Sequence, residues 1–148
     1  MTARPEAREL GPGESHLAAT ALLELRPRYG SAEAIVARID EQRADGYRLA
    51  ASFEPGDEQA AAVAGFRIGT NLAWGHHVYV DDLVTRKDLR GRGHADAVMA
   101  VVEEIARGAR CGQLHLDSGL GPDRADAHRF YFRHGLTITS HHFGRALD

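Results

Sequence analysis

The sequence predicts an α/β domain with a mixed sheet, and three observations support this fold class. Residues 47–53 alternate apolar with small or polar side chains, and residues 60–70 and 76–85 are rich in strand-forming residues, which is typical of antiparallel strands. A glycine-rich turn follows, and then an amphipathic helix and a short apolar strand at 114–117. A strand–helix–strand unit of this kind implies a parallel strand pair with a right-handed connection.

The N-terminal part predicts two helices. Apolar residues recur at helical spacing over residues 14–25, and Pro27 stops the pattern. Ser31 can cap a second helix, which ends at Gly46. A short strand around residues 7–10 precedes both helices.

The C-terminal part predicts one more helix and a last strand. Asp123 or Asp126 can cap the helix, and Gly135 ends it. Residues 136–147 alternate loosely, which predicts a final strand or strand pair. This strand is short, which favours completion of the sheet edge by a second subunit and hence a homodimer. Because nothing in the sequence reads as a linker or repeat, we expect residues 1–148 to form a single domain.

Composition narrows the class of protein. An apolar share of 43% and a charged share of 26% are those of a globular domain with a core. A net charge of −3 gives no general attraction to nucleic acid or to an anionic membrane. The single cysteine, Cys111, argues against a disulfide framework and cysteine-based metal sites, and we expect no metal. Without an apolar run of roughly 20 residues or a signal-like N-terminus, a cytoplasmic location is expected.

The turn RGRGHA, residues 90–95, is the strongest local signal. It lies between a strand and the helix that spans about residues 95–109, where free backbone amides and the positive end of the helix dipole attract phosphate. Its glycines let the backbone approach an anion without a Cβ in the way. The turn therefore predicts a phosphorylated ligand.

Two signatures, in this order, resemble the GNAT superfamily of acyl-CoA-dependent N-acyltransferases. The first is Arg90, Gly93 and Ala95, in the pattern of Arg or Gln, two residues, Gly, one residue, and Gly or Ala. The second is AHRFYFRHGL at residues 127–136, in which an alanine precedes a Phe-Tyr pair and a glycine closes the helix. The motifs cover about residues 45–148, and the N-terminal helices agree with the family by architecture only.

The resemblance implies the family's fold, with mostly antiparallel N-terminal strands, a splayed parallel pair and flanking helices. It also implies acetyl-CoA as co-substrate and transfer of its acetyl group to a primary amine by direct attack through a tetrahedral intermediate. Backbone groups at the strand end would bind the pantetheine arm, and the turn with a basic helix residue would bind the phosphates. The positions that it assigns to the cofactor are Leu83, Val84, Thr85, Arg90, Gly91, Arg92, Gly93, His94, Ala95 and Arg133. Arg124 departs from the family, which often has Asn there.

The resemblance also implies catalytic residues. Tyr131 matches the tyrosine that protonates the departing thiolate, and Asp81 matches an acid that accepts the amine's proton through water or binds the ammonium group. Asp82 is the second candidate acid. Since side chains alternate along a strand, we expect only one of the two aspartates to face the acceptor cleft.

Several alternatives stay open at this stage. The amine can belong to a small metabolite, a drug, a peptide N-terminus or a lysine, and the acyl group can be acetyl or longer. The carboxylates favour a small cationic acceptor. A non-catalytic acyl-CoA-binding or sensing module of the same fold is the main competing function. A Rossmann-type nucleotide-binding protein is disfavoured by the antiparallel strands before the turn.

Overall fold

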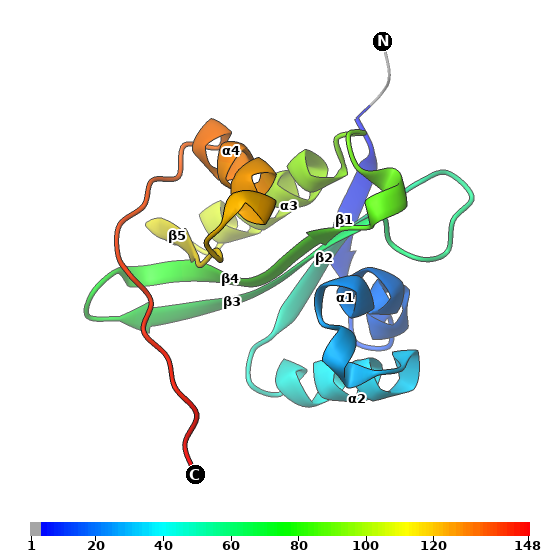
Figure 1. The fold of residues 1–148 in the computed structure, drawn as a ribbon, viewed down its shortest axis with the longest axis horizontal. Coiled ribbons are helices and arrows are strands. Elements are labelled where there is room, and N and C mark those ends of the chain that lie inside the picture. The colour runs from blue at the N-terminus through cyan, green and yellow to red at the C-terminus, as the bar shows by residue number, and fades with distance from the viewer. Residues whose placement is uncertain (1–3) are drawn as a thin grey trace. The chain divides into compact units, whose positions relative to one another are not determined.

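A five-stranded sheet in the order β1-β2-β3-β4-β5 organises the fold (Figure 1). The first four strands pair as antiparallel neighbours, and β5 lies parallel to β4. The strands are β1 Glu6–Leu10, β2 Arg48–Phe53, β3 Ala62–Asn71, β4 Gly75–Thr85 and β5 Gln113–Leu116. The mixed sheet and the predicted strands up to residue 116 are thereby confirmed.

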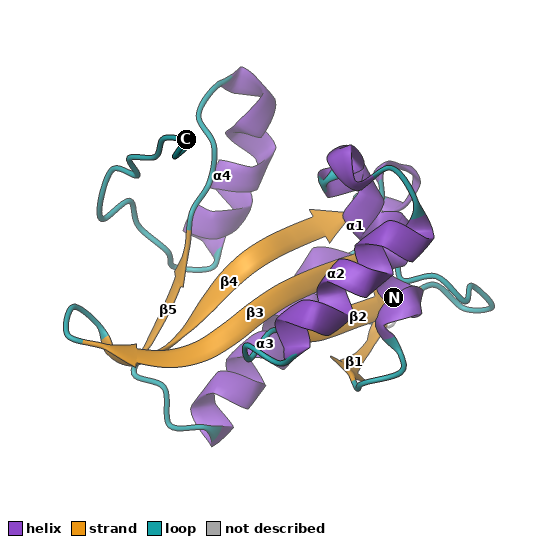
Figure 2. Ribbon diagram, turned by 90° about the horizontal axis from the view of Figure 1, so that it is seen from below, coloured by secondary structure: helices purple, strands orange, loops and turns teal. Residues whose placement is uncertain are grey.

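Helices cover both faces of this sheet. Figure 2 shows α2 (Ala32–Arg43) in front of the strands and α3 (His94–Gly108) behind them, and α1 (Ala19–Leu25) contacts β3 and β4 beside α2. Short 3₁₀ turns connect the elements at Ser15–Ala18, Pro27–Tyr29, Lys87–Leu89 and Pro122–Arg124. The predicted N-cap of α2 is confirmed, because the Ser31 hydroxyl accepts a hydrogen bond from the Ala34 amide at 3.1 Å.

The structure, a computed structural model, describes residues 4–148. The chain divides into two units, Met1–His115 and Leu116–Asp148, and each is described by itself. The second unit contains α4 (Ala125–Arg133). The prediction of a single domain stays a prediction.

The core of the first unit explains why these segments fold together. One apolar cluster joins α1 and α2 to the sheet, and its fully buried members include Leu10, Leu49 and Val63. On the other face, α3 buries Val98, Met99 and Val102, each 0% exposed, against β1, β2 and β3. Removing this much apolar surface from water stabilises both faces of the sheet.

Two predictions for the second unit are wrong. The described residues 136–148 form neither helix nor strand, and Ile138 and Phe143 are 76% and 92% exposed. Their alternation lacks a buried face to pack, so it does not produce a strand. The position before α4 is Arg124, and neither Asp123 nor Asp126 caps this described helix through its side chain. A 3₁₀ turn leads into α4 and takes the place of a capped start.

Candidate active site

The backbone of the turn between β4 and α3 is open to an anion. Gly91 and Gly93 adopt left-handed φ angles of 78° and 86°, which a residue with a Cβ rarely tolerates. Gly93 is the N-cap of α3, and no side chain in the described residues caps this helix end. The first amides of a helix lack intrahelical partners. The turn therefore offers N–H donors at the positive end of a 15-residue helix.

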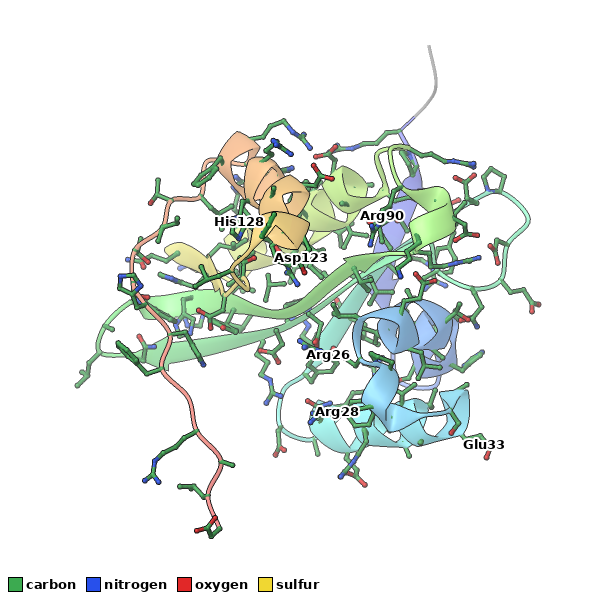
Figure 3. All side chains as sticks on the ribbon, viewed as in Figure 1. Arg26, Arg28, Glu33, Arg90, Asp123 and His128 are labelled. Carbon is green, nitrogen blue, oxygen red and sulfur yellow. The ribbon has the colours of Figure 1, made fainter. Side chains whose placement is uncertain are left out.

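Side chains around the turn divide into a solvated group and an anchoring group. Arg90 is exposed, and it lies at the turn in Figure 3. His94 is only 2% exposed, and its Nδ1 and Nε2 lie 2.9 Å from Ser52 Oγ and Glu54 Oε1. Glu54 also accepts a hydrogen bond from Arg92 at 3.2 Å. The His94 side chain thus anchors the turn to β2, which leaves its backbone amide as the group available to a ligand.

Glu54 carries a negative charge at this turn. Its hydrogen bond with His94, followed by the contact with Arg92, lowers the pKa of the Glu54 carboxyl below its ordinary value. The carboxylate holds the turn in place, and it also lies among the positive groups that would attract a phosphate.

The end of β4 extends past its parallel neighbour. The Gly112 amide, just before β5, donates to the His76 carbonyl, and β5 has four residues whereas β4 continues to Thr85 (Figure 1). On the other edge, the predicted pantetheine-binding residues Leu83, Val84 and Thr85 pair with β3. Because β5 begins beside His76 and has only four residues, the backbone of Leu83, Val84 and Thr85 lies past the end of β5.

A β-bulge places both candidate acids in one cleft. Gly65 pairs with Asp82, whereas the next residue, Phe66, pairs with Val80, so Asp81 is an extra residue on β4. Asp81 and Asp82 both line the same cleft. The prediction that only one of them faces the cleft is wrong, because the bulge interrupts the alternation on which it rested.

Asp82 is held from two sides. Its Oδ1 accepts hydrogen bonds from Arg26 Nε at 2.9 Å and Nη2 at 2.7 Å, and its Oδ2 accepts one from the Tyr47 hydroxyl at 2.7 Å. Burial raises the pKa of the Tyr47 phenol far above its ordinary value, and the Asp82 charge raises it further. Tyr47 therefore stays protonated and acts as a fixed donor to Asp82.

Asp81 has a looser environment than Asp82. Its Oδ2 accepts one hydrogen bond from Arg67 Nε at 2.8 Å. Burial raises the pKa of the Asp81 carboxyl above its ordinary value, and Arg67 opposes this change. A carboxylate that is partly desolvated is a better proton acceptor than a solvated one, so Asp81 is the stronger candidate base of the pair.

The cleft itself lies between the sheet and the α1–α2 layer. It has a volume of about 450 Å³, and its charged lining residues are Arg26, Arg28, Arg38, Arg67, Asp81 and Asp82. Figure 3 shows Arg26 and Arg28 on the side of the strands that α1 and α2 cover. Sequence reasoning missed all four arginines and Tyr47, and no local motif marks them, since they come from separate segments.

The second unit holds the other predicted site residues. Tyr131 is half-buried on α4, burial raises the pKa of its phenol, and Arg124 opposes this change. The Arg133 guanidinium lies 5.4 Å from the centre of the Phe130 ring. His128, labelled in Figure 3, lies with its Nε2 2.9 Å from the Gly119 carbonyl, so it ties the preceding loop to the helix.

Neither a metal centre nor a membrane span is present in the part of the chain that the structure describes. Residues 4–148 contain no group of three or more His, Cys, Asp or Glu side chains placed to bind one ion. None of the described helices has the length and hydropathy that a membrane crossing requires.

Comparison with known proteins identifies the family. The sequence model of the acetyltransferase (GNAT) family matches residues 16–136. The chain belongs to this family. It is also similar to the uncharacterized N-acetyltransferase YhdJ of Bacillus subtilis (strain 168), with 34% identity over 104 residues, or 70% of each chain. The GNAT assignment makes the protein an acyltransferase and supports acyl-CoA-dependent N-acetyltransferase activity in general.

Solved structures confirm the GNAT fold over nearly the whole chain. The aminoglycoside N-acetyltransferase AAC(6')-Iy, in complex with CoA, superposes with a TM-score of 0.79 at 16% identity and covers 99% of this chain and 97% of its own. The ribosomal-protein-alanine N-acetyltransferase of Brucella melitensis biovar Abortus 2308 gives a TM-score of 0.77 at 17% identity and covers 96% and 98%. Identities this low establish the fold and leave the acceptor of this GNAT protein undefined.

Proposed function

We propose that this GNAT protein transfers an acetyl group from acetyl-CoA to a primary amine. One observation carries the proposal: within the first unit, an anion-accepting helix N-terminus and a cleft with two carboxylates are joined by the last residues of β4. The turn at Gly91–Ala95, with Arg90 and Arg92, would bind the CoA phosphates through its amides. The backbone of Leu83, Val84 and Thr85 would bind the pantetheine arm, as in the family.

The chemistry follows from the groups in the cleft. The amine nitrogen attacks the thioester carbonyl carbon, so a C–N bond forms, and the C–S bond then breaks to release the CoA thiolate. Asp81 accepts the proton of the amine, directly or through a water molecule, because it is the less firmly paired carboxylate. Asp82 accepts three hydrogen bonds, two from Arg26 and one from Tyr47, and so holds these two side chains of the cleft in position.

Tyr131 is the proposed acid that returns a proton to the departing thiolate. Its match to the family tyrosine supports this role, and its raised pKa keeps the phenol protonated near neutral pH. Arg133 is proposed to assist with the cofactor's phosphates on the same grounds of resemblance. A homodimer also stays a prediction.

The activity is tested by following free CoA thiol while the full chain is incubated with acetyl-CoA and a panel of amines. Thiol release that exceeds hydrolysis for at least one amine is the expected result. Acetyl-CoA binding without any such release would instead indicate a non-catalytic acyl-CoA-binding module. Tight binding of NAD in place of acetyl-CoA would reject both.

The role of Tyr131 is tested with Tyr131→Phe. Loss of the acid should lower kcat by about 100-fold, at the low end for general acid catalysis, while acetyl-CoA affinity stays the same. Phe132→Leu, an exposed neighbour on α4, serves as the control for helix integrity. An equal loss of turnover and affinity in Tyr131→Phe would mean that the residue supports the fold.

A further inference from the structure

The charge of the acceptor cleft points to a substrate class. Four arginines and two aspartates line it, which is a formal excess of two positive charges. The prediction of a cationic acceptor rested on the carboxylates alone and did not include the four arginines. We infer that the acceptor is a small amine whose other end carries an oxyanion, either a carboxylate or a phosphate. This inference rests on the proposed function, because it names the amine that the same cleft would bind.

The two aspartates do not give the cleft a negative character. Asp82 is paired with Arg26 at 2.7 Å, and Asp81 is paired with Arg67 at 2.8 Å. Each carboxylate is therefore neutralised by an arginine of the cleft before any ligand enters. A ligand with positive charges only would find no net attraction there, since each aspartate already has its counter-charge.

Arg28 is the positive charge without a counter-charge. Its Nη2 donates to the Tyr29 hydroxyl at 3.0 Å, and its guanidinium lies 4.9 Å from the centre of the Tyr29 ring. No carboxylate forms an ion pair with Arg28 in residues 4–148. Arg38, the fourth arginine, pairs with Glu41 at 2.9 Å, which offsets one of the two excess charges.

Tyr29 orients Arg28 as an anion-binding group. A guanidinium has five N–H donors, and the contact with the Tyr29 hydroxyl uses one of them. The planar fork that remains matches the geometry of a carboxylate or a phosphate. The lining thus combines carboxylates of β4, which can accept N–H groups of an amine, with an unneutralised arginine from the turn after α1.

The size of the cleft agrees with a small acceptor. Its volume of about 450 Å³ lies within the range of roughly 300–1,000 Å³ that is usual for small-molecule sites. A molecule of the size of an amino acid fits inside this volume.

The inference is tested by measuring kcat/KM for matched amines at saturating acetyl-CoA with the full chain. γ-Aminobutyrate is compared with butylamine, which keeps the amine but lacks the carboxylate, and with putrescine, which carries a second amine in place of the carboxylate. Phosphoethanolamine is compared with ethanolamine, so that the two pairs distinguish a carboxylate from a phosphate. We expect a higher kcat/KM for at least one anion-bearing amine, and the better one identifies the oxyanion.

Arg28→Gln should remove this preference. Since Arg28 is exposed, kcat/KM for the anion-bearing amine should fall by only about fivefold, mainly through KM, while the value for butylamine stays the same. Arg107→Gln is the matched control: this arginine is 78% exposed on α3, and it pairs with Glu103 at 3.7 Å. A preference for butylamine or putrescine, or an equal loss for all amines in Arg28→Gln, would overturn the inference.

Calorimetric titration separates failure of the inference from failure of the proposed function. If no amine raises thiol release above hydrolysis, the proposed function fails. Binding of γ-aminobutyrate or phosphoethanolamine, weakened by Arg28→Gln and not by Arg107→Gln, would still support an anion site in the cleft. Equal binding of the anion-bearing amines and of their counterparts without the oxyanion would reject it.

Discussion

The turn at residues 90–95 and the cleft at Asp81 and Asp82 are near neighbours in the chain, yet they are built in different ways. The turn is made by consecutive residues, and its properties follow from two glycines and a helix end. The cleft is made by residues from α1, α2, β3 and β4, together with connecting segments such as the one that contains Tyr47. The turn proposed to bind the cofactor is therefore encoded locally, whereas the cleft proposed to bind the acceptor depends on how several elements meet.

The comparison also separates two electrostatic designs. At the turn, one carboxylate, Glu54, contacts both Arg92 and His94 and anchors them. In the cleft, arginines outnumber carboxylates, and the pairs hold Asp81 and Asp82 in defined positions. Substitutions in the two regions should consequently affect different steps of the reaction.

Asp81→Asn should give the largest effect and show that the chemistry belongs to the cleft. Loss of the proton acceptor should lower kcat/KM by about 100-fold, with acetyl-CoA affinity unchanged. The measurement is steady-state kinetics together with a cofactor titration. Asp45→Asn, an exposed aspartate after α2, is the control. A parallel loss of acetyl-CoA affinity would contradict the division between turn and cleft.

The pH profile sharpens the same prediction. Because burial raises the pKa of Asp81 above its ordinary value of 3.8, its base form develops at higher pH than in a solvated aspartate. The kcat/KM of the wild type should rise with pH through that raised pKa, and this limb should be missing in Asp81→Asn. An identical limb in both proteins would assign the base elsewhere.

Gly65→Ala should break the cleft through packing alone. A Cβ at this position would lie 1.8 Å from the Tyr47 hydroxyl, so the ring must leave its place and its bond to Asp82. We expect a loss of about 1–3 kcal/mol in the free energy of unfolding, the range for overpacking a core, together with lower activity. Chemical denaturation measures this change in the free energy of unfolding.

Gly69→Ala is the matched control on the same strand. Its Cβ would meet its nearest neighbour, His77, at an ordinary 3.7 Å. If both variants lost the same stability, the effect would come from strand glycines in general and not from Tyr47.

Gly93→Ala should weaken the turn and spare the cleft. A residue with a Cβ at φ 86° costs about 1–2 kcal/mol of stability, and a turn that shifts to relieve this should bind acetyl-CoA about tenfold more weakly. Calorimetry with acetyl-CoA and thermal unfolding measure the two effects. Gly108→Ala at the other end of α3 should leave acetyl-CoA affinity unchanged. A change in the KM of the acceptor, with acetyl-CoA affinity unchanged, would contradict the prediction that Gly93 acts on the turn and not on the cleft.

Glu54→Gln should give the smallest effect. Removing one negative charge beside the turn should strengthen acetyl-CoA binding about twofold at low ionic strength, and the gain should vanish in high salt. Glu58→Gln in the same loop is the control. Weaker binding in Glu54→Gln would show that anchoring His94 matters more than the charge.

Glu54 also predicts a pH dependence of stability. Its pKa is lowered from an ordinary 4.5, so its contribution is fully present above that pH and is lost as the pH falls through the folded value. Unfolding of Glu54→Gln at several pH values should show a shallower acid loss than the wild type.

The sequence by itself determined the order of elements up to residue 116 and the anion-accepting turn. Helical and strand periodicity are local properties, and the glycines at 91 and 93 report a backbone shape directly. The prediction failed at residues 136–148, because alternation produces a strand only where a partner and a buried face exist.

Only the tertiary structure decided the cleft at Asp81 and Asp82, which is the proposed acceptor site. The bulge that turns Asp81 and Asp82 to one side arises from pairing with β3, which periodicity along a single strand cannot reveal. Arg26, Tyr47 and Arg67 reach these carboxylates across 56, 35 and 14 residues of sequence. The sign of the cleft's charge depends on such long-range neighbours, because electrostatic interactions depend on distance in space and not on separation along the chain.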